Sequence, residues 1–322
     1  MTSAGLATDS SADPAPISAQ ALSLHPDRFF DSDPAIRRAA RDIHAATCTL
    51  PLICPHGHVD PWLLATNAPF PEPTALLITP DHYILRMLCS QGVSMDSMGV
   101  PTIDGSPVEQ NPRIIWQRFA AHFHLFLGTP TGVWFNHTLH ELFGVREKLV
   151  ATNSARIYDQ IAERLASPEF LPRALFERFR IEVLATTDAA GDTLEPHRLI
   201  RDSGWSGRVV PTFRPDAVFR IASAQWRIAL AALETQHGSA IPSFADFLGA
   251  LASRRAYFAS LGATATDHAV VTPFTQRLDR AQLDRLFDAA LAGTATASDQ
   301  RAFEAHMLIE MARMSTEDGL VM

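Results

Sequence analysis

Lysine is almost absent from this sequence. Of the 27 Lys and Arg residues in its 322 residues, Lys148 is the single lysine. The stretch around it, residues 144–150, reads as a helix, which places Lys148 away from the end of any strand. A lysine that forms a Schiff base, or a carboxylated lysine that bridges two metal ions, therefore has almost no candidate.

Other scarcities narrow the class of protein. Three cysteines, Cys48, Cys54 and Cys89, do not make a disulfide framework and suit the reducing cytoplasm. The net charge of −8 does not suggest a basic surface of the kind that binds nucleic acid. No apolar run approaches the roughly 18 residues that a membrane span needs. With 47% hydrophobic and 19% charged residues, the sequence indicates a cytoplasmic globular protein that binds neither nucleic acid nor membrane.

The first twenty residues lack Lys and Arg and are rich in Ala, Ser, Thr and Pro. A secretory signal needs a basic start and an apolar centre, so we expect residues 1–24 to be a disordered tail. The remaining residues, 25–322, are enough for one large α/β domain or two smaller ones.

Two histidines stand at the end of an apolar run that begins at Leu50. His56 and His58 are two residues apart, and in an extended strand such residues point to the same side. Neutral imidazole is a common ligand of zinc and related divalent metals. We therefore expect these two side chains to share a metal ion at the end of a buried strand.

A second His-x-His pair, His122 and His124, supplies an internal comparison. It lies in residues 119–127, which read as a helix. Residues two apart on a helix are about 200° apart around its axis and cannot share a metal. We interpret His122 and His124 as packing or surface residues.

The pattern of elements predicts the fold class. Helices are expected over 27–49, where Asp33 is the cap and Pro34 the first helical residue, and through most of 62–180. Strands are then expected at 181–187, 207–213 and 263–268, alternating with helices near 216–237, 243–262, 279–292 and 298–314. This alternation predicts an α/β fold, a (β/α)8 TIM-like barrel with a helical insertion at about 62–180. A doubly wound sheet is the alternative, but no Gly-x-Gly-x-x-Gly turn follows a strand.

Polar residues follow consecutive predicted strands. After His56 and His58 come Asp188, then Arg214 and Asp216, then Asp267 and His268. In parallel barrels the sites are built at the carboxyl ends of the strands. A helix cap or a loop ion pair explains any one of these residues, but not the whole series.

The same segments resemble the uronate isomerase family. The resemblance rests on residues 54–61, 81–93, 128–134, 186–188, 211–216 and 266–268, and it extends from about residue 25 to the end. It implies a metal-dependent barrel of the amidohydrolase type. The implied reaction interconverts D-glucuronate with D-fructuronate and D-galacturonate with D-tagaturonate, and the implied partner is a small-molecule uronate. Homo-oligomerisation stays open.

The resemblance also implies roles for individual residues. His56 and His58 match metal ligands, with zinc the expected divalent ion. Tyr83, His82 and Asp267 match residues of the catalytic site, while Arg214, His268 and Asp188 match residues that contact the substrate. For Arg214 the chemistry agrees, because a planar guanidinium suits a carboxylate.

The sequence departs from the family pattern in two places. Ala189 occupies a position where the family often has a second Asp. Asp188 and Asp192 are therefore the carboxylates that remain as candidates in this segment. The sequence also stops on an apolar strand start at residues 319–322. We therefore expect the barrel to be C-terminally truncated, short of a third metal ligand, and inactive as the 322-residue chain alone. Two rivals remain: a metal-dependent amidohydrolase or lactonase of the same fold, and an inactive barrel that binds sugar acids.

Overall fold

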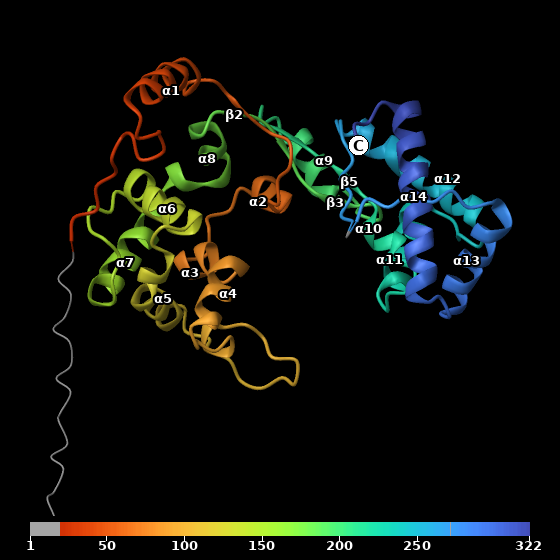
Figure 1. The fold of residues 1–322 in the computed structure, drawn as a ribbon, viewed down its shortest axis with the longest axis horizontal. Helices are drawn as coiled ribbons and strands as arrows, with labels where there is room; N and C mark the ends of the chain where they lie inside the picture. Colours follow the sequence, from red (N-terminus) through yellow and green to blue (C-terminus); the bar gives the residue numbers. More distant parts are fainter. Residues whose placement is uncertain (1–19, 271) are drawn as a thin grey trace, which may run out of the picture. The chain divides into compact units, whose positions relative to one another are not determined.

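The computed structural model describes residues 20–270 and 272–322 as an α/β protein of two compact units (Figure 1). One unit combines the chain up to Thr49 with Pro69–Leu171, and the other combines Leu50–Ala68 with Pro172–Met322. Of the helical insertion predicted at about 62–180, Pro69–Leu171 belongs to the first unit, while residues 62–68 and 172–180 belong to the second. The helix expected at 27–49 belongs to the same unit as that insertion, and not to the unit that holds the strands.

The first unit is mainly helical. Its elements are α1 (Pro34–Thr47), α3 (Pro73–Leu77), α4 (His82–Ser90), η1 (Asp96–Met98), α5 (Pro112–Ala121), η2 (Phe123–Phe126), α6 (Pro130–His137), η3 (Thr138–Leu142), η4 (Ala151–Asn153), α7 (Ser154–Leu165) and η5 (Pro168–Phe170). The side chain of Asp33 accepts hydrogen bonds from the first turn of α1, as expected for a cap. Buried aromatic rings of α5, η2 and α6, among them Trp116, Phe119 and Phe135, form the core of this unit.

Residues near the start of the described chain are paired, and this corrects two predictions. Ala21 forms an antiparallel bridge with Glu147, and the N–H of Lys148 donates to the carbonyl of Gln20 at 2.8 Å. Lys148 therefore lies in an extended segment, and its helical assignment was wrong. Of the predicted tail, residues 1–19 lie outside the described residues, while Gln20–Leu22 are held against 146–148 by these backbone hydrogen bonds.

The second unit alternates strands and helices. Its elements are β1 (Leu52–Cys54), α2 (Pro61–Thr66), α8 (Pro172–Arg178), β2 (Ile181–Ala185), β3 (Asp188–Ala189), α9 (Glu195–Asp202), β4 (Arg208–Val210), β5 (Phe213–Arg214), α10 (Asp216–Phe219), α11 (Trp226–His237), α12 (Phe244–Ser260), α13 (Arg280–Ala292) and α14 (Ala297–Asp318). Ser243 caps α12, as the sequence predicts.

The strands are parallel, and within each sheet they are arranged in chain order. The order in the first sheet is β1-β2-β4, and β3 pairs with β5 just beyond it. Parallel bridges then join Phe213 to Thr266 and Ala265 to Val321. A doubly wound sheet would reverse this order at a switch point. Throughout the described residues the order does not reverse.

Some predicted elements are interrupted. The strand expected at 207–213 is divided into β4 and β5, and the helix expected at 216–237 is divided into α10 and α11. The strand expected at 263–268 is present only as isolated bridges.

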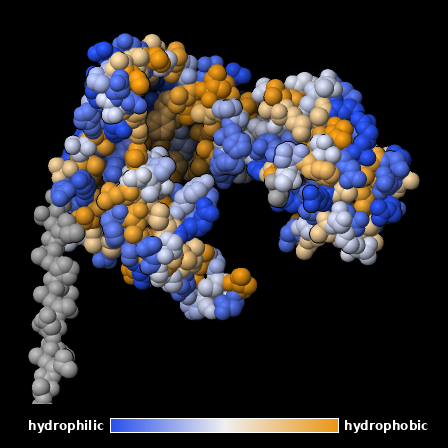
Figure 2. Space-filling view, viewed as in Figure 1, coloured by the Kyte–Doolittle hydropathy of each residue, from blue (hydrophilic) through white to orange (hydrophobic). Residues whose placement is uncertain are grey.

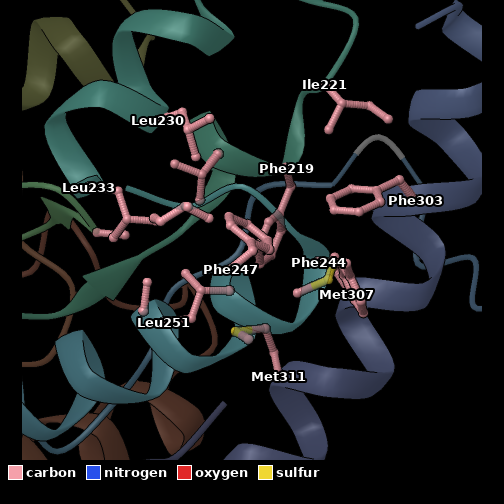
Figure 3. Close-up of a cluster of buried hydrophobic side chains, with 14 of the residues drawn as sticks. Phe219, Ile221, Leu230, Leu233, Phe244, Phe247, Leu251, Phe303, Met307 and Met311 are labelled. Atoms are coloured by element: carbon pink, nitrogen blue, oxygen red, sulfur yellow. The ribbon is translucent and has the colours of Figure 1, made fainter. Parts of the chain in front are cut away.

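Helices α10, α11, α12, α13 and α14 share one apolar core. Phe219, Phe247 and Phe303 converge there with Met307 and Met311 (Figure 3). Each of these side chains is at most 4% exposed. Phe213 of β5 and Ala263, which precede two of the polar loops, belong to the same core.

The first strand is less buried than predicted. Leu52 and Ile53 are 51% and 65% exposed, because β1 pairs with β2 on one side and is the edge of the described sheet. Apolar residues at the surface are visible in orange in Figure 2. Among the described helices, none is both long and apolar enough to cross a membrane.

Candidate functional site

The turn after β1 is tied to the neighbouring strand. The N–H of Gly57 donates to the carbonyl of Ala185 at 2.8 Å, and the hydroxyl of Thr187 donates to the carbonyl of Gly57 at 3.0 Å. A Cβ at position 57 would lie 2.6 Å from the Ala185 oxygen, so a residue with a side chain does not fit. The backbone between His56 and His58 is therefore fixed.

This turn brings the two histidine side chains together. The Nε2 atoms of His56 and His58 are 2.9 Å apart, and both rings are exposed. Zinc–imidazole bonds are about 2.0–2.1 Å long, so two such nitrogens can share one ion with a small adjustment. The predicted convergence of His56 and His58 is present.

Asp267 and Arg214 lie next to this pair. The Oδ2 atom of Asp267 is 3.7 Å from Nδ1 of His56 and 3.4 Å from Nη1 of Arg214. Arg214 also donates from Nε to Asp216 at 2.6 Å, and this hydrogen bond with Asp216 raises the pKa of Arg214. The guanidinium is thus oriented by two carboxylates and stays charged.

His268 lies in the same loop as Asp267 and is half-buried. Its Nε2 is 3.0 Å from the hydroxyl of Thr266, and its Nδ1 is buried without a hydrogen-bond partner in the described chain. Burial lowers the pKa of His268, so the ring is neutral at pH 7. The backbone N–H of Ala269 donates to Asp216, which links this loop to the one after β5.

Asp188 is buried, which the sequence did not indicate. It is 6% exposed, and its Oδ2 accepts from the hydroxyl of Thr186 at 2.7 Å and from the N–H of Thr212 at 3.3 Å. Burial raises the pKa of Asp188 to about 6, and the charge of Asp192 adds to this effect. The nearby ring of His197 is 3% exposed, and its burial lowers its pKa to about 4.

Sequence reasoning missed Thr186 and His197 as partners of Asp188. Thr186 could have been found, because it lies two residues before Asp188 and so points to the same side of an extended segment. His197 carries no comparable signal, since only the packing of α9 brings it within 2.8 Å of Thr186.

A cavity of about 420 Å³ lies beside Asp188. It is lined by Asp60, Trp62, Thr187, Asp188, Asp192 and neighbouring residues of the same unit. Arg254 is 4% exposed and donates from Nε to the carbonyl of Ala190 at 3.0 Å, which fixes the loop leading into this cavity.

His82 and Tyr83 belong to the first unit. They open α4, whose cap Asp81 accepts from the N–H of Tyr83 at 2.8 Å. Their rings lie 4.2 Å apart between centroids, and Tyr83 is 61% exposed. Both side chains are therefore open to solvent instead of being packed on the core of their unit.

The comparison pair differs from His56 and His58. His122 caps the end of α5 and His124 lies in η2, with ring centroids 6.4 Å apart. Over residues 20–270 and 272–322, no group of three or more His, Cys, Asp or Glu side chains is arranged to hold a metal ion. Among the described residues, His56 and His58 therefore lie together without a third side chain of these types in a metal-binding arrangement.

Comparison with known proteins identifies the family. The family model described as glucuronate isomerase matches residues 32–322. The uronate isomerase of Nostoc punctiforme is 50% identical over 300 residues, covering 93% of this chain and 63% of that protein. The uronate isomerase of Rhizobium meliloti is 47% identical over 299 residues, covering 93% of this chain and 64% of that protein.

Comparison with solved structures gives the same family. The glucuronate isomerase of Caulobacter crescentus has a TM-score of 0.90 and 45% identity, covering 94% of this chain and 63% of that chain. The uronate isomerase of Thermotoga maritima has a TM-score of 0.82 and 25% identity, covering 92% and 62%.

Parallel strands in chain order, alternating with helices and with polar residues at their carboxyl ends, define a parallel α/β protein. The chain belongs to the glucuronate isomerase family. It spans about 63% of the length of the Nostoc punctiforme relative.

Proposed function

We propose that the protein acts in the aldose–ketose isomerisation of uronates, interconverting D-glucuronate with D-fructuronate and D-galacturonate with D-tagaturonate. Membership of the family supports this proposal. The observation that carries it is the convergence of a histidine pair, a carboxylate and an arginine: His56, His58, Asp267 and Arg214.

We propose a (β/α)8 barrel as the scaffold. The described strands run parallel in chain order without a switch point, which is the arrangement of a barrel wall. Two Nε2 atoms 2.9 Å apart fit a shared divalent cation, and we propose zinc, held by His56 and His58. Such a cation polarises carbonyl and hydroxyl oxygens of a sugar.

Arg214 is proposed to bind the uronate carboxylate. Asp216 and Asp267 orient its guanidinium, which is 30% exposed and so accessible to a ligand. Arg214→Lys keeps a positive charge but loses the planar fork. We expect this variant to bind D-glucuronate at least tenfold more weakly while its binding of D-glucose, which lacks the carboxylate, is unchanged. Equal loss for both sugars would place the carboxylate contact elsewhere.

The isomerisation moves a proton between C2 and C1 through an enediol, so a base and a proton donor are needed. We propose Asp267, whose Oδ2 is buried without a hydrogen-bond partner in the described chain, as the base. Tyr83 and His82 are proposed to donate protons or hydrogen bonds to the sugar oxygens. His268 and Asp188 are proposed to contact sugar hydroxyls.

The decisive assay measures ketose formation from D-glucuronate. Because the chain spans 63% of the Nostoc punctiforme relative, we would compare the chain alone with a chimaera that adds the uncovered part of that relative. We expect the chimaera to form D-fructuronate with added zinc, and His58→Ala to abolish turnover. The expected inactivity of the 322 residues alone stays a prediction, as do a cytoplasmic location and homo-oligomerisation.

The rival functions have different outcomes in this assay. Hydrolysis of glucuronolactone by the chimaera, with no ketose formed, would show a lactonase. Binding of uronate without turnover, under conditions where the parent relative is active, would show an inactive sugar-acid binder. Either result would overturn the isomerase proposal.

A further inference from the structure

Thr186, Asp188 and His197 form a buried polar cluster. Their exposed fractions are 1%, 6% and 3%. The hydroxyl oxygen of Thr186 lies 2.7 Å from Oδ2 of Asp188 and 2.8 Å from Nε2 of His197. The imidazole and the carboxylate are themselves 3.8 Å apart, so the hydroxyl connects them.

The number of protons in the cluster fixes the direction of each hydrogen bond. Thr186 has one hydroxyl proton, and an ionised carboxylate can only accept. Thr186 therefore donates its proton to Asp188 over the shorter distance. The alternative acceptor, the carbonyl of Val210, is 3.3 Å away. The oxygen of Thr186 must then accept from Nε2–H of His197. This tautomer leaves Nδ1 bare, and Nδ1 has no hydrogen-bond partner in the described chain.

The two carboxylate oxygens of Asp188 differ in their hydrogen-bond partners. The hydrogen bonds that the described residues make to its carboxylate end on Oδ2, while Asp188 also lines the cavity of about 420 Å³. A cavity of this size is in the range of small-ligand sites. The hydroxyl of Thr187 and the carboxylate of Asp192 line it too. Such a lining suits the hydroxyl groups of a sugar acid.

We infer that His197 is a positioning residue: through the hydroxyl of Thr186 it holds the Asp188 carboxylate in one orientation, with its free oxygen toward the cavity, where it accepts from a uronate hydroxyl. This inference rests on the proposed function. His197 itself lies behind Thr186 and does not contact the sugar.

The variants separate the hydrogen bond from packing. His197→Phe keeps a ring and removes the donor, whereas His197→Gln keeps an amide N–H near the position of Nε2. Thr186→Val removes the hydroxyl and keeps the branched shape. If His197→Phe fails to fold, Thr186→Val and the wild-type spectrum still decide the question.

The first readout is nuclear magnetic resonance of the 322-residue chain. We expect the ring ¹⁵N spectrum of His197 to show a protonated Nε2 and a bare Nδ1 at neutral pH. We expect the pKa of Asp188, followed by its carboxyl ¹³C signal, to rise in His197→Phe and Thr186→Val, because the Thr186 hydrogen bond lowers it. His197→Gln should keep the wild-type pKa; Asp192, which faces both groups, is unchanged in every variant. An Nδ1–H tautomer, or an unchanged Asp188 pKa in His197→Phe, would overturn the inference.

The second readout is binding of D-glucuronate to the zinc-loaded chimaera described above, unsubstituted and with each variant. We expect about tenfold weaker binding in His197→Phe and Thr186→Val, and wild-type binding in His197→Gln. If the unsubstituted chimaera binds and its His197→Phe variant binds equally well, the positioning role is wrong while the proposed function stands. If the unsubstituted chimaera does not bind uronate, the proposed function fails, and the spectra still decide whether His197 orients Asp188.

Discussion

At the residue scale, what surrounds a histidine pair decides what the pair can do. His56 and His58 follow a strand and bring their Nε2 atoms to 2.9 Å. His122 and His124 have the same spacing, yet His122 caps a helix and directs Nδ1 to the carbonyl of Arg118 at 2.8 Å. Two histidines that are two residues apart can share a metal ion only where the backbone between them is extended.

This difference predicts the outcome of metal titration. His56→Ala and His58→Ala should each lower the affinity of the chain for zinc by at least tenfold, because one imidazole ligand is lost from the pair. His124→Ala is the matched control and should leave zinc binding unchanged. Equilibrium dialysis followed by metal analysis measures the effect. Wild-type zinc content in both His56 and His58 variants would refute the ligand assignment.

The buried pair Asp188 and His197 predicts a dependence of stability on pH. Burial raises the pKa of Asp188 from 3.8 to about 6, so its contribution to stability is lost as the pH rises from about 4 to about 6. Burial lowers the pKa of His197 from 6.5 to about 4, so its contribution is lost as the pH falls from about 6.5 to about 4. In the wild type the two effects oppose each other over the same range.

Removing one partner should expose the effect of the other. On acidification from about pH 6.5 to pH 4, His197→Gln should gain stability relative to the wild type, and Asp188→Asn should lose it. Each difference is on the order of 2 kcal/mol. Urea unfolding followed at several pH values measures it. Parallel pH profiles for all three proteins would show that these groups titrate normally.

At the element scale, the β1–α2 turn depends on one close backbone approach. Gly57 contacts β2 where a Cβ would lie 2.6 Å from the carbonyl oxygen of Ala185. Gly249, in the middle of α12, has open space instead, with no atom within 4 Å of its built Cβ. The two glycines therefore differ in what a methyl group would meet.

Alanine substitutions should have opposite effects at these glycines. Gly57→Ala should destabilise the strand-containing unit by about 1–3 kcal/mol and weaken zinc binding, because the turn must move away from β2. Gly249→Ala should stabilise it by about 0.5–1 kcal/mol, since alanine favours a helix interior. Thermal unfolding and zinc titration of both variants test this. A harmless Gly57→Ala would mean that the turn adapts without cost.

Local signals predicted some elements well and others poorly. The caps Asp33 and Ser243 marked the starts of α1 and α12 correctly, because a cap is made by residues adjacent in sequence. The strand expected at 207–213 is divided in two, since a strand's limits depend on the neighbour that supplies its hydrogen bonds. The helical assignment of Lys148 failed for the same reason: Gln20 pairs with it from far away in the sequence.

At the scale of the whole molecule, each compact unit has a core of its own. Phe119 is fully buried in the helical unit, and Phe247 is fully buried in the strand-containing unit. The phenylalanine pair allows the two cores to be perturbed separately with the same change in side-chain volume.

Phe247→Ala should cost about 3–5 kcal/mol in its unit and weaken zinc binding by His56 and His58, which belong to that unit. Phe119→Ala should destabilise the helical unit to a similar extent and leave zinc affinity unchanged. Calorimetry together with zinc titration checks both outcomes. Equal loss of zinc affinity in the two variants would show that the cores unfold together.

The sequence by itself determined the shared direction of His56 and His58, the capped helices and the series of polar residues after strands. These follow from neighbours within a few positions and from backbone periodicity. Tertiary structure alone decided that Asp188 is buried against Thr186 and beside His197, that β1 is an edge in the described sheet, and that the chain divides after Thr49. Burial and strand pairing depend on residues distant in sequence. No local sequence pattern shows which of these residues come into contact.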